Sequence, residues 1–379
     1  MSDRSRRTRI AVVATVLLIA ATLLGGCADF SDQDRARAAG DFSSETVTPA
    51  VPTPTPPSES PQEGPAPTGP CVDPDPAVIA TCLGATSAVM PGGDAQGEST
   101  VVAERATGQI IATRRNGPKK VIASIPVDAD GDGGLMDFAP SPTYDQDRLI
   151  YAYISTASDN RVVRIAPGDT PKPILTGIPK GATGNVGSLH FRSPTELLVA
   201  TGDAGNPASA GDPGSLAGKL LSVTALTSGS TAAPRVLASG LGANATICAN
   251  ASSGQLYLTD RAPTEDRLQI IDTTGTLRPL WTWPGRPQIS GCAAAGSSVL
   301  VSTARTQRVE LLGEPTREKP TVSPPVVVFE KRYGALGRMT ALPSGLFQVG
   351  TINKQGGRPV ATDDRVVRFL PPTSSESNV

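Results

Sequence analysis

Histidine, the residue that most often serves as a general base, is scarce in this chain of 379 residues. Its one histidine is His190, which excludes a zinc site built from several histidines and makes His190 the only candidate for a histidine general base. No Gly-x-Ser-x-Gly elbow and no Gly-x-x-x-x-Gly-Lys loop occurs. The 34 Lys and Arg residues balance 35 Asp and Glu residues, a net charge of −1, so nothing favours nucleic-acid binding.

One acidic turn has the spacing of a metal-binding loop. The stretch Asp128-Ala-Asp-Gly-Asp-Gly-Gly resembles the start of an EF-hand calcium loop, with Asp128, Asp130 and Asp132 as ligand candidates. The twelfth loop position is Ala139 instead of glutamate, and no flanking helices are predicted. A partial Ca²⁺ loop and a solvated acidic turn both remain open, and the turn is favoured.

The N-terminus has the pattern of a bacterial lipoprotein signal. Four arginines precede an apolar run of about fifteen residues, Ile10 to Leu24, which is short for a transmembrane helix. Leu24-Gly25-Gly26-Cys27 resembles a lipobox, in which the cysteine is diacylated before cleavage. We expect residues 1–26 to be the signal peptide and Cys27 to carry palmitate-type chains that hold the protein on the extracytoplasmic face of the cell membrane. A buried helix with a chance cysteine is the alternative.

The other four cysteines would then lie in an oxidising compartment, where disulfides form. Four cysteines allow three pairings. Proximity in sequence favours a Cys71–Cys82 bridge, which leaves Cys248–Cys292 as the second bridge. Free buried thiols are the alternative. No CxxC spacing supports a zinc site.

Composition divides the rest of the chain into a linker and an all-β domain. Residues 27–70 are rich in Pro, Ser and Thr and predict a disordered tether, and residues 374–379 predict a disordered tail. Glycine (39) and proline (36) are frequent, which argues against a helical bundle. Short runs rich in Val, Ile, Leu and Thr recur between turn residues over 71–373, about two dozen in all. A sandwich, a β-helix or a propeller would fit this pattern, and four strands per blade give about six blades.

Several segments resemble the glucose/sorbosone dehydrogenase family, the soluble PQQ-dependent aldose dehydrogenases. They cover most of the β region in order: Gly108–Arg115, Gly133–Ala139, Asp147–Tyr153, Asp159–Arg164, Leu198–Pro207, Asp212–Leu221, Ser253–Asp260, Ser290-Gly291, Leu342–Gly345 and Asp364–Phe369. The resemblance implies a six-bladed β-propeller. It also implies a site for PQQ and Ca²⁺ and oxidation of an aldose by a histidine base. With the lipobox and the tether, the chain is similar to LppZ-type actinobacterial lipoproteins.

The family's catalytic histidine is replaced in this sequence. In the stretch Thr183-Gly-Asn-Val-Gly-Ser-Leu-His-Phe its position falls on Gly184. His190 lies six residues later, a distance of about 20 Å along a strand. The sequence therefore predicts that His190 is a half-buried strand residue that does not stand in for the base.

Most of the family's anion-binding residues are also replaced. The resemblance places Gly242 and Ala243 at its arginine and asparagine, and Ala335 and Gly337 at its Arg-x-Arg pair. Strand alternation would send the neighbouring Arg338 to the other face. Arg305 retains the charge of the family lysine. The resemblance places Asp132 at the position of one of the family's polar cofactor-binding residues. Its negative charge would repel PQQ, which is a tricarboxylate.

These replacements lead to a functional expectation. We expect a membrane-anchored envelope lipoprotein whose PQQ site is degraded and which binds an unidentified envelope ligand or protein, with no cofactor. The alternative is an active aldose dehydrogenase, an oxidoreductase that uses PQQ and Ca²⁺ with rearranged ligands. A metal-dependent hydrolase or lactonase is a third option, which no residue pattern supports directly.

Overall fold

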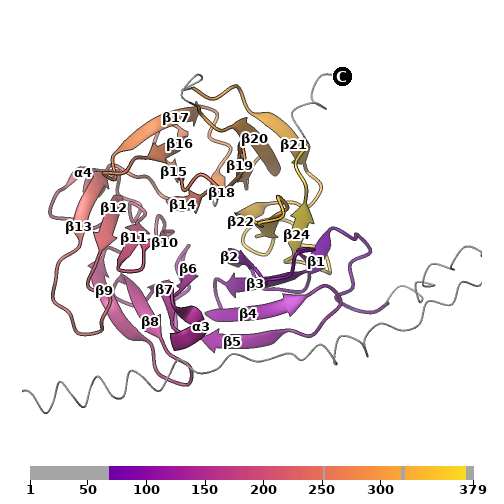
Figure 1. Cartoon of the computed structure of the whole chain (residues 1–379), viewed down its shortest axis with the longest axis horizontal. Helices are drawn as coiled ribbons and strands as arrows, with labels where there is room; N and C mark the ends of the chain where they lie inside the picture. The colour runs from indigo at the N-terminus through magenta and orange to yellow at the C-terminus, as the bar shows by residue number, and fades with distance from the viewer. Residues whose placement is uncertain (1–67, 251, 317–320, 373–379) are drawn as a thin grey trace, which may run out of the picture. The chain divides into compact units, whose positions relative to one another are not determined.

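The computed structural model describes residues 68–250, 252–316 and 321–372. The predicted signal peptide, Cys27, nearly all of the tether and the tail lie outside these residues. The predicted all-β class and six-bladed propeller are confirmed, because six four-stranded antiparallel sheets surround a central channel (Figure 1).

The first three blades run in sequence order from the innermost to the outermost strand. The first contains β2 (Thr86–Pro91), β3 (Ser99–Glu104), β4 (Gln109–Arg114) and β5 (Lys120–Ser124). The second contains β6 (Leu135–Pro140), β7 (Ile150–Ser155), β8 (Asn160–Ile165) and β9 (Lys172–Ile178). The third contains β10 (Ser188–Ser193), β11 (Glu196–Ala200), β12 (Lys219–Val223) and β13 (Arg235–Ser239).

The last three blades follow the same pattern until the ring closes. The fourth contains β14 (Thr246–Ala249), β15 (Leu256–Arg261), β16 (Asp266–Ile271) and β17 (Leu277–Trp283). The fifth contains β18 (Ile289–Ala295), β19 (Ser298–Thr303), β20 (Arg308–Gly313) and β21 (Val326–Glu330). The sixth contains β22 (Leu336–Ala341), β23 (Phe347–Thr351) and β24 (Val366–Phe369), and its fourth strand is the N-terminal β1 (Val78–Ala80).

Two short helices lie in the connections within the described residues, α3 (Tyr144–Asp147) and α4 (Pro207–Gly211). The side chain of Asn206 caps α4 by accepting a hydrogen bond from the Ala208 amide. No helix in the described part of the chain is long and apolar enough to cross a membrane.

The core is divided among the interfaces between neighbouring blades. One buried cluster joins blades two and three through Tyr153, Leu197 and Leu221, all with no exposed surface. Equivalent clusters lie at the other blade interfaces. Each blade is therefore buried on both faces, which explains the nearly continuous apolar runs in its middle strands.

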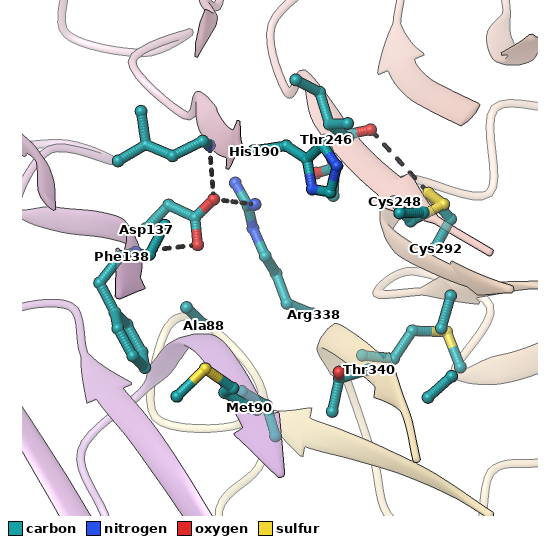
Figure 2. Close-up of a pocket in the computed structure, with 18 of the residues that line it drawn as sticks. Ala88, Met90, Asp137, Phe138, His190, Thr246, Cys248, Cys292, Arg338 and Thr340 are labelled. Carbon is teal, nitrogen blue, oxygen red and sulfur yellow. Dashed lines mark hydrogen bonds and ion pairs between the residues drawn. A yellow bond between two sulfur atoms is a disulfide. The ribbon is translucent and has the colours of Figure 1, made fainter. Parts of the chain in front are cut away.

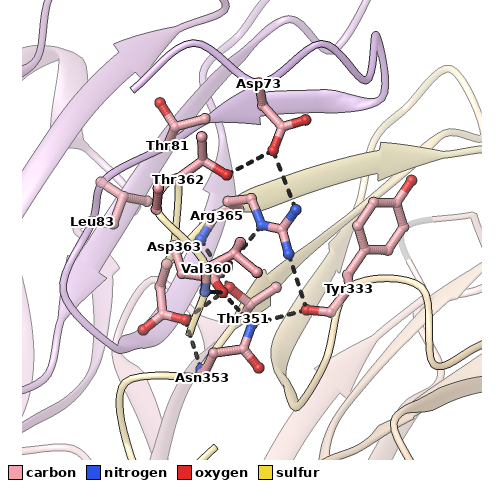
Figure 3. Close-up of polar contacts among 12 residues, drawn as sticks. Asp73, Thr81, Leu83, Tyr333, Thr351, Asn353, Val360, Thr362, Asp363 and Arg365 are labelled. Carbon is pink, nitrogen blue, oxygen red and sulfur yellow. Dashed lines mark hydrogen bonds and ion pairs between the residues drawn. The ribbon is translucent and has the colours of Figure 1, made fainter. Parts of the chain in front are cut away.

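The ring is closed by strand pairing and by a polar cluster (Figure 3). β1 pairs with β24, with Val78 opposite Val367. The guanidinium group of Arg365 donates to Asp73 (3.2 Å), Asp363 (2.7 Å) and the Tyr333 carbonyl (3.3 Å). The segment that follows the tether is thereby held to the closing blade.

Both predicted disulfides are confirmed. Cys71–Cys82 has a Cα–Cα distance of 5.5 Å and lies where the N-terminal segment meets the closing blade. Cys248–Cys292 has a Cα–Cα distance of 5.7 Å and links β14 to β18, the innermost strands of the fourth and fifth blades. The second bridge therefore lies in the wall of the central channel.

Candidate functional site

One mouth of the channel contains a polar pocket of about 110 Å³ lined by three arginines, Arg105, Arg261 and Arg338. Asp132 lines the same pocket. Arg105 directly follows β3, Arg261 ends β15, and Arg338 lies within β22. The three guanidinium groups come from blades one, four and six, so only closure of the ring brings them together.

Arg105 is held by backbone carbonyl groups and has no carboxylate ion-pair partner among the described residues. Its Nη1 donates to the carbonyl oxygens of Ala129 (3.2 Å) and Gly133, while its buried Nε has no hydrogen-bond partner. Burial lowers the pKa of Arg105, and the charge of Asp132 opposes this shift. An unpaired cation with an unused donor favours an anionic ligand at this mouth.

Arg261 is held in a similar way. Its Nε donates to the Ile289 carbonyl (2.6 Å), and its Nη2 donates to Ser290 Oγ (3.1 Å) and to the Gln288 carbonyl (3.3 Å). Burial lowers the pKa of Arg261 to about 10, although the charges of Asp266 and Asp132 raise it. The side chain is therefore charged at neutral pH and fixed in place.

Arg338 corrects an expectation from the sequence. Its predicted orientation away from the channel mouth is wrong, because a bulge between Leu336 and Met339 interrupts the alternation of β22. The side chain lies in the channel, where Nη1 pairs with Asp137 Oδ2 at 3.1 Å and Nη2 donates to the Gly187 carbonyl at 2.5 Å. Burial raises the pKa of Asp137 even though Arg338 opposes this shift.

Asp132 lines the mouth, but its hydrogen bonds serve the neighbouring loop. Its carboxylate accepts from the Gly184 amide (2.7 Å), the Asn185 amide (3.1 Å) and Asn185 Nδ2 (2.6 Å). These three donors compensate its charge and hold the loop that contains Gly184. Asp132 therefore reduces the positive charge of the mouth and fixes the loop that contains Gly184 and Asn185.

The space beside Gly184, where the sequence resemblance places the family's catalytic histidine, is filled by the neighbouring loop. Gly184 has φ +76°, a left-handed conformation that side chains rarely adopt. A Cβ atom there would lie 2.3 Å from the Gly205 amide nitrogen and 2.4 Å from Asp203 Oδ1. A histidine at this position would therefore require the neighbouring loop to move.

The acidic turn is not assembled as a metal site. Asp128 forms an ion pair with Lys180, while Asp132 is engaged with the Gly184 loop. No group of three or more His, Cys, Asp or Glu side chains within 68–250, 252–316 and 321–372 could hold a metal ion. The donors of Asp128, Asp130 and Asp132 thus do not gather as a calcium loop would require.

Arg305 takes no part in lining the mouth. Its Nη2 donates to the carbonyl oxygens of Gly285 and Arg286, on the exposed surface. Sequence reasoning selected this residue and missed Arg105 and Arg261. A signal was present, since both missed arginines lie at strand ends: Arg105 directly follows β3, and Arg261 is the last residue of β15.

Arg338 separates the mouth from a second, larger cavity farther along the channel. This chamber has a volume of about 350 Å³ and is lined by His190, Asp137, Phe138 and the Cys248–Cys292 disulfide (Figure 2). His190 lies on the innermost strand β10 and is half-buried, as predicted from its place in the sequence. It is not among the residues that line the arginine mouth.

Burial lowers the pKa of His190, so the imidazole is expected to be neutral at pH 7. Asp137 and Arg338 are the charged groups that line the same chamber, and they neutralise each other. Since this is the chain's one histidine, a ¹³Cε1-histidine spectrum should contain a single resonance. We expect its pH titration to have a midpoint below the ordinary value of about 6.5. A midpoint at or above that value would contradict the burial argument.

Fold and site together define a class of protein, a six-bladed β-propeller with a cationic pocket at one channel mouth. Residues 92–274 match the sequence model of the family described as Glucose / Sorbosone dehydrogenase. The resemblance to this family that was predicted from the sequence is thus confirmed over residues 92–274.

Solved structures extend the likeness to nearly the whole propeller. The PQQ-bound aldose sugar dehydrogenase from Streptomyces coelicolor is 26% identical, with a TM-score of 0.66 over 77% of this chain and 95% of that chain. A glucose dehydrogenase-type oxidoreductase from Thermus thermophilus is 25% identical, with a TM-score of 0.66 over 77% and 98% of the two chains. The Escherichia coli aldose sugar dehydrogenase, at 18% identity and a TM-score of 0.63 over 78% and 99%, shares the fold. No curated protein matches this chain.

Proposed function

We propose that this protein is a lipid-anchored, extracytoplasmic binding protein that uses a dehydrogenase-type propeller to hold a small anionic molecule and does not oxidise sugars. The observation that carries this proposal is the convergence of Arg105, Arg261 and Arg338 on one mouth. It is supported by the lack of space for a side chain at Gly184, where the resemblance places the catalytic histidine. The arginines can therefore bind an anion, whereas no histidine lines this mouth to act as the base that oxidation of a sugar hydroxyl requires.

The residues fit PQQ only in part. Two of its three carboxylates could pair with Arg105 and Arg261, which is a better match than the sequence suggested with Arg305 alone, while Arg338 is already paired with Asp137. The base that sugar oxidation requires has no counterpart at Gly184, and the oxygens of Asp132 are already engaged by three donors. We therefore derive no catalytic step through this cofactor. An active PQQ- and Ca²⁺-dependent aldose dehydrogenase is the rival function, supported by the likeness to the PQQ-bound Streptomyces coelicolor enzyme.

The anion-binding proposal is tested by replacing the two mouth arginines that have no carboxylate ion-pair partner among the described residues. Arg105→Gln and Arg261→Gln should each weaken binding of citrate, a tricarboxylate probe, by at least about ten-fold, since each removes a charged hydrogen bond of about 1.5–3 kcal/mol. Arg278→Gln, on the exposed outer strand β17, is the matched control and should bind normally. Isothermal titration calorimetry supplies the affinities. Equal affinities in all variants would refute the arginine mouth as the anion site.

The absence of catalysis is tested by adding PQQ and Ca²⁺ and measuring dye reduction with a panel of aldoses. No PQQ-dependent turnover is expected, even if PQQ binds. Turnover would overturn the binding-protein proposal and support the dehydrogenase.

The proposed anchor depends on Cys27. Replacing Cys27 with alanine removes the acylated thiol, so the protein should leave the membrane fraction or accumulate as the uncleaved precursor. Cell fractionation with immunoblotting measures this. Unchanged processing and membrane retention in the variant would show that the anchor lies elsewhere.

A further inference from the structure

The chamber beyond Arg338 has the size and composition of a second ligand site. Its volume of about 350 Å³ falls within the range of small-molecule pockets, about 300–1,000 Å³. Innermost strands of all six blades contribute to its wall, including β2 through Met90, β6 through Phe138 and β10 through His190. Closure of the ring therefore builds it as a rigid, preformed cavity.

Two polar side chains in the wall are free to bind a ligand. The imidazole of His190 and the hydroxyl of Thr340 both line the chamber, and neither forms a hydrogen bond with another described residue. Figure 2 shows both among the side chains around the chamber. A neutral imidazole offers one donor and one acceptor, and the hydroxyl offers both.

The remaining wall indicates which chemistry would occupy the chamber. The charges of Asp137 and Arg338 compensate each other at 3.1 Å, so the wall offers no net charge to an ion. The thioether of Met90 lies on the same side of the chamber as Phe138, and the Cys248–Cys292 disulfide contributes sulfur atoms to the opposite side (Figure 2). Sulfur and aromatic groups make favourable contacts with an aromatic ring.

We propose that this chamber binds an uncharged aromatic molecule with a hydroxyl group, of the phenol class, through His190 and Thr340. The ring packs against Met90 and Phe138, while the hydroxyl group bonds the imidazole. This site is distinct from the anion mouth and does not depend on the proposed function of that mouth.

The one histidine makes the test direct. Purified protein without a histidine tag, labelled at histidine Cε1, is titrated with 2-naphthol and separately with the carboxylate 2-naphthoate. The single His190 resonance should shift saturably with 2-naphthol at one-to-one stoichiometry, and the affinity for 2-naphthoate should be at least ten-fold lower. Absence of a saturable shift, or equal affinity for the two probes, would overturn the proposal.

Variants of Thr340 locate the site. Thr340→Trp fills the chamber and should abolish the shift. Thr340→Val keeps the side-chain size but removes the hydroxyl, and should weaken 2-naphthol binding by a few-fold to about ten-fold. If the Trp variant does not fold, the affinity of the Val variant tests the site instead.

The double variant Arg105→Gln/Arg261→Gln should bind 2-naphthol normally, which separates this site from the mouth. Unchanged affinity in the Val variant, or lost affinity in the arginine variant, would contradict the assignment.

Discussion

Replacing Arg338 with methionine is expected to lower the free energy of unfolding by about 3–5 kcal/mol at pH 7. The variant leaves the carboxylate of Asp137 buried without its cation, although the amides of Phe138 and Leu189 still donate to it at 2.9 Å and 2.8 Å. Urea unfolding of the variant and the natural protein measures the difference.

The loss should depend on pH in a defined direction. Burial raises the pKa of Asp137 in the folded protein, and removing Arg338 raises it further, while an unfolded aspartate titrates near about 3.9. Below that value both states are protonated. As the pH rises, the unfolded state releases its proton first and folding becomes less favourable. The difference between variant and natural protein should therefore grow from pH 4 to pH 7.

A matched double variant separates pairing from packing. Asp137→Asn/Arg338→Met leaves no unpaired charge and should recover most of the lost stability at pH 7. If Arg338→Met alone were as stable as the natural protein at pH 7, or if its loss were independent of pH, the buried-pair argument would fail.

Replacing both Cys248 and Cys292 with alanine is expected to cost about 4 kcal/mol by the loop-closure estimate. The bridge spans 44 residues and joins innermost strands of adjacent blades. Without it the unfolded chain gains conformational freedom. Denaturant midpoints measure the loss.

Two controls make this result specific. Adding a reductant should lower the stability of the natural protein by breaking both bridges. The same reductant should lower the stability of the Cys248/Cys292 variant less, because only the Cys71–Cys82 bridge remains to be broken. Cys71→Ala/Cys82→Ala should lose less, about 3 kcal/mol, since that bridge spans 11 residues. Equal stability of the Cys248/Cys292 variant and the natural protein would show that the blade interface alone holds these strands together.

The sequence by itself determined the all-β class, and its family resemblance indicated the six-bladed propeller. The spacing of short apolar runs predicted about two dozen strands, and the structure has 24 in its described part. Both disulfides followed from the proximity of Cys71 and Cys82 in the sequence, which leaves Cys248 and Cys292 as the second pair. These features depend on the alternation of short apolar runs with turn residues and on the spacing of the cysteines, both of which can be read directly from a sequence.

The tertiary structure decided which cations meet at the mouth. Arg105, Arg261 and Arg338 are far apart in the chain, and only ring closure brings strand ends of blades one, four and six together. The orientation of Arg338 also required the structure, because the bulge before Met339 breaks the alternation from which a side chain's face is predicted. The closed space at Gly184 likewise arises from the Asp203–Gly205 loop. Such contacts depend on long-range packing, which local residue patterns do not specify.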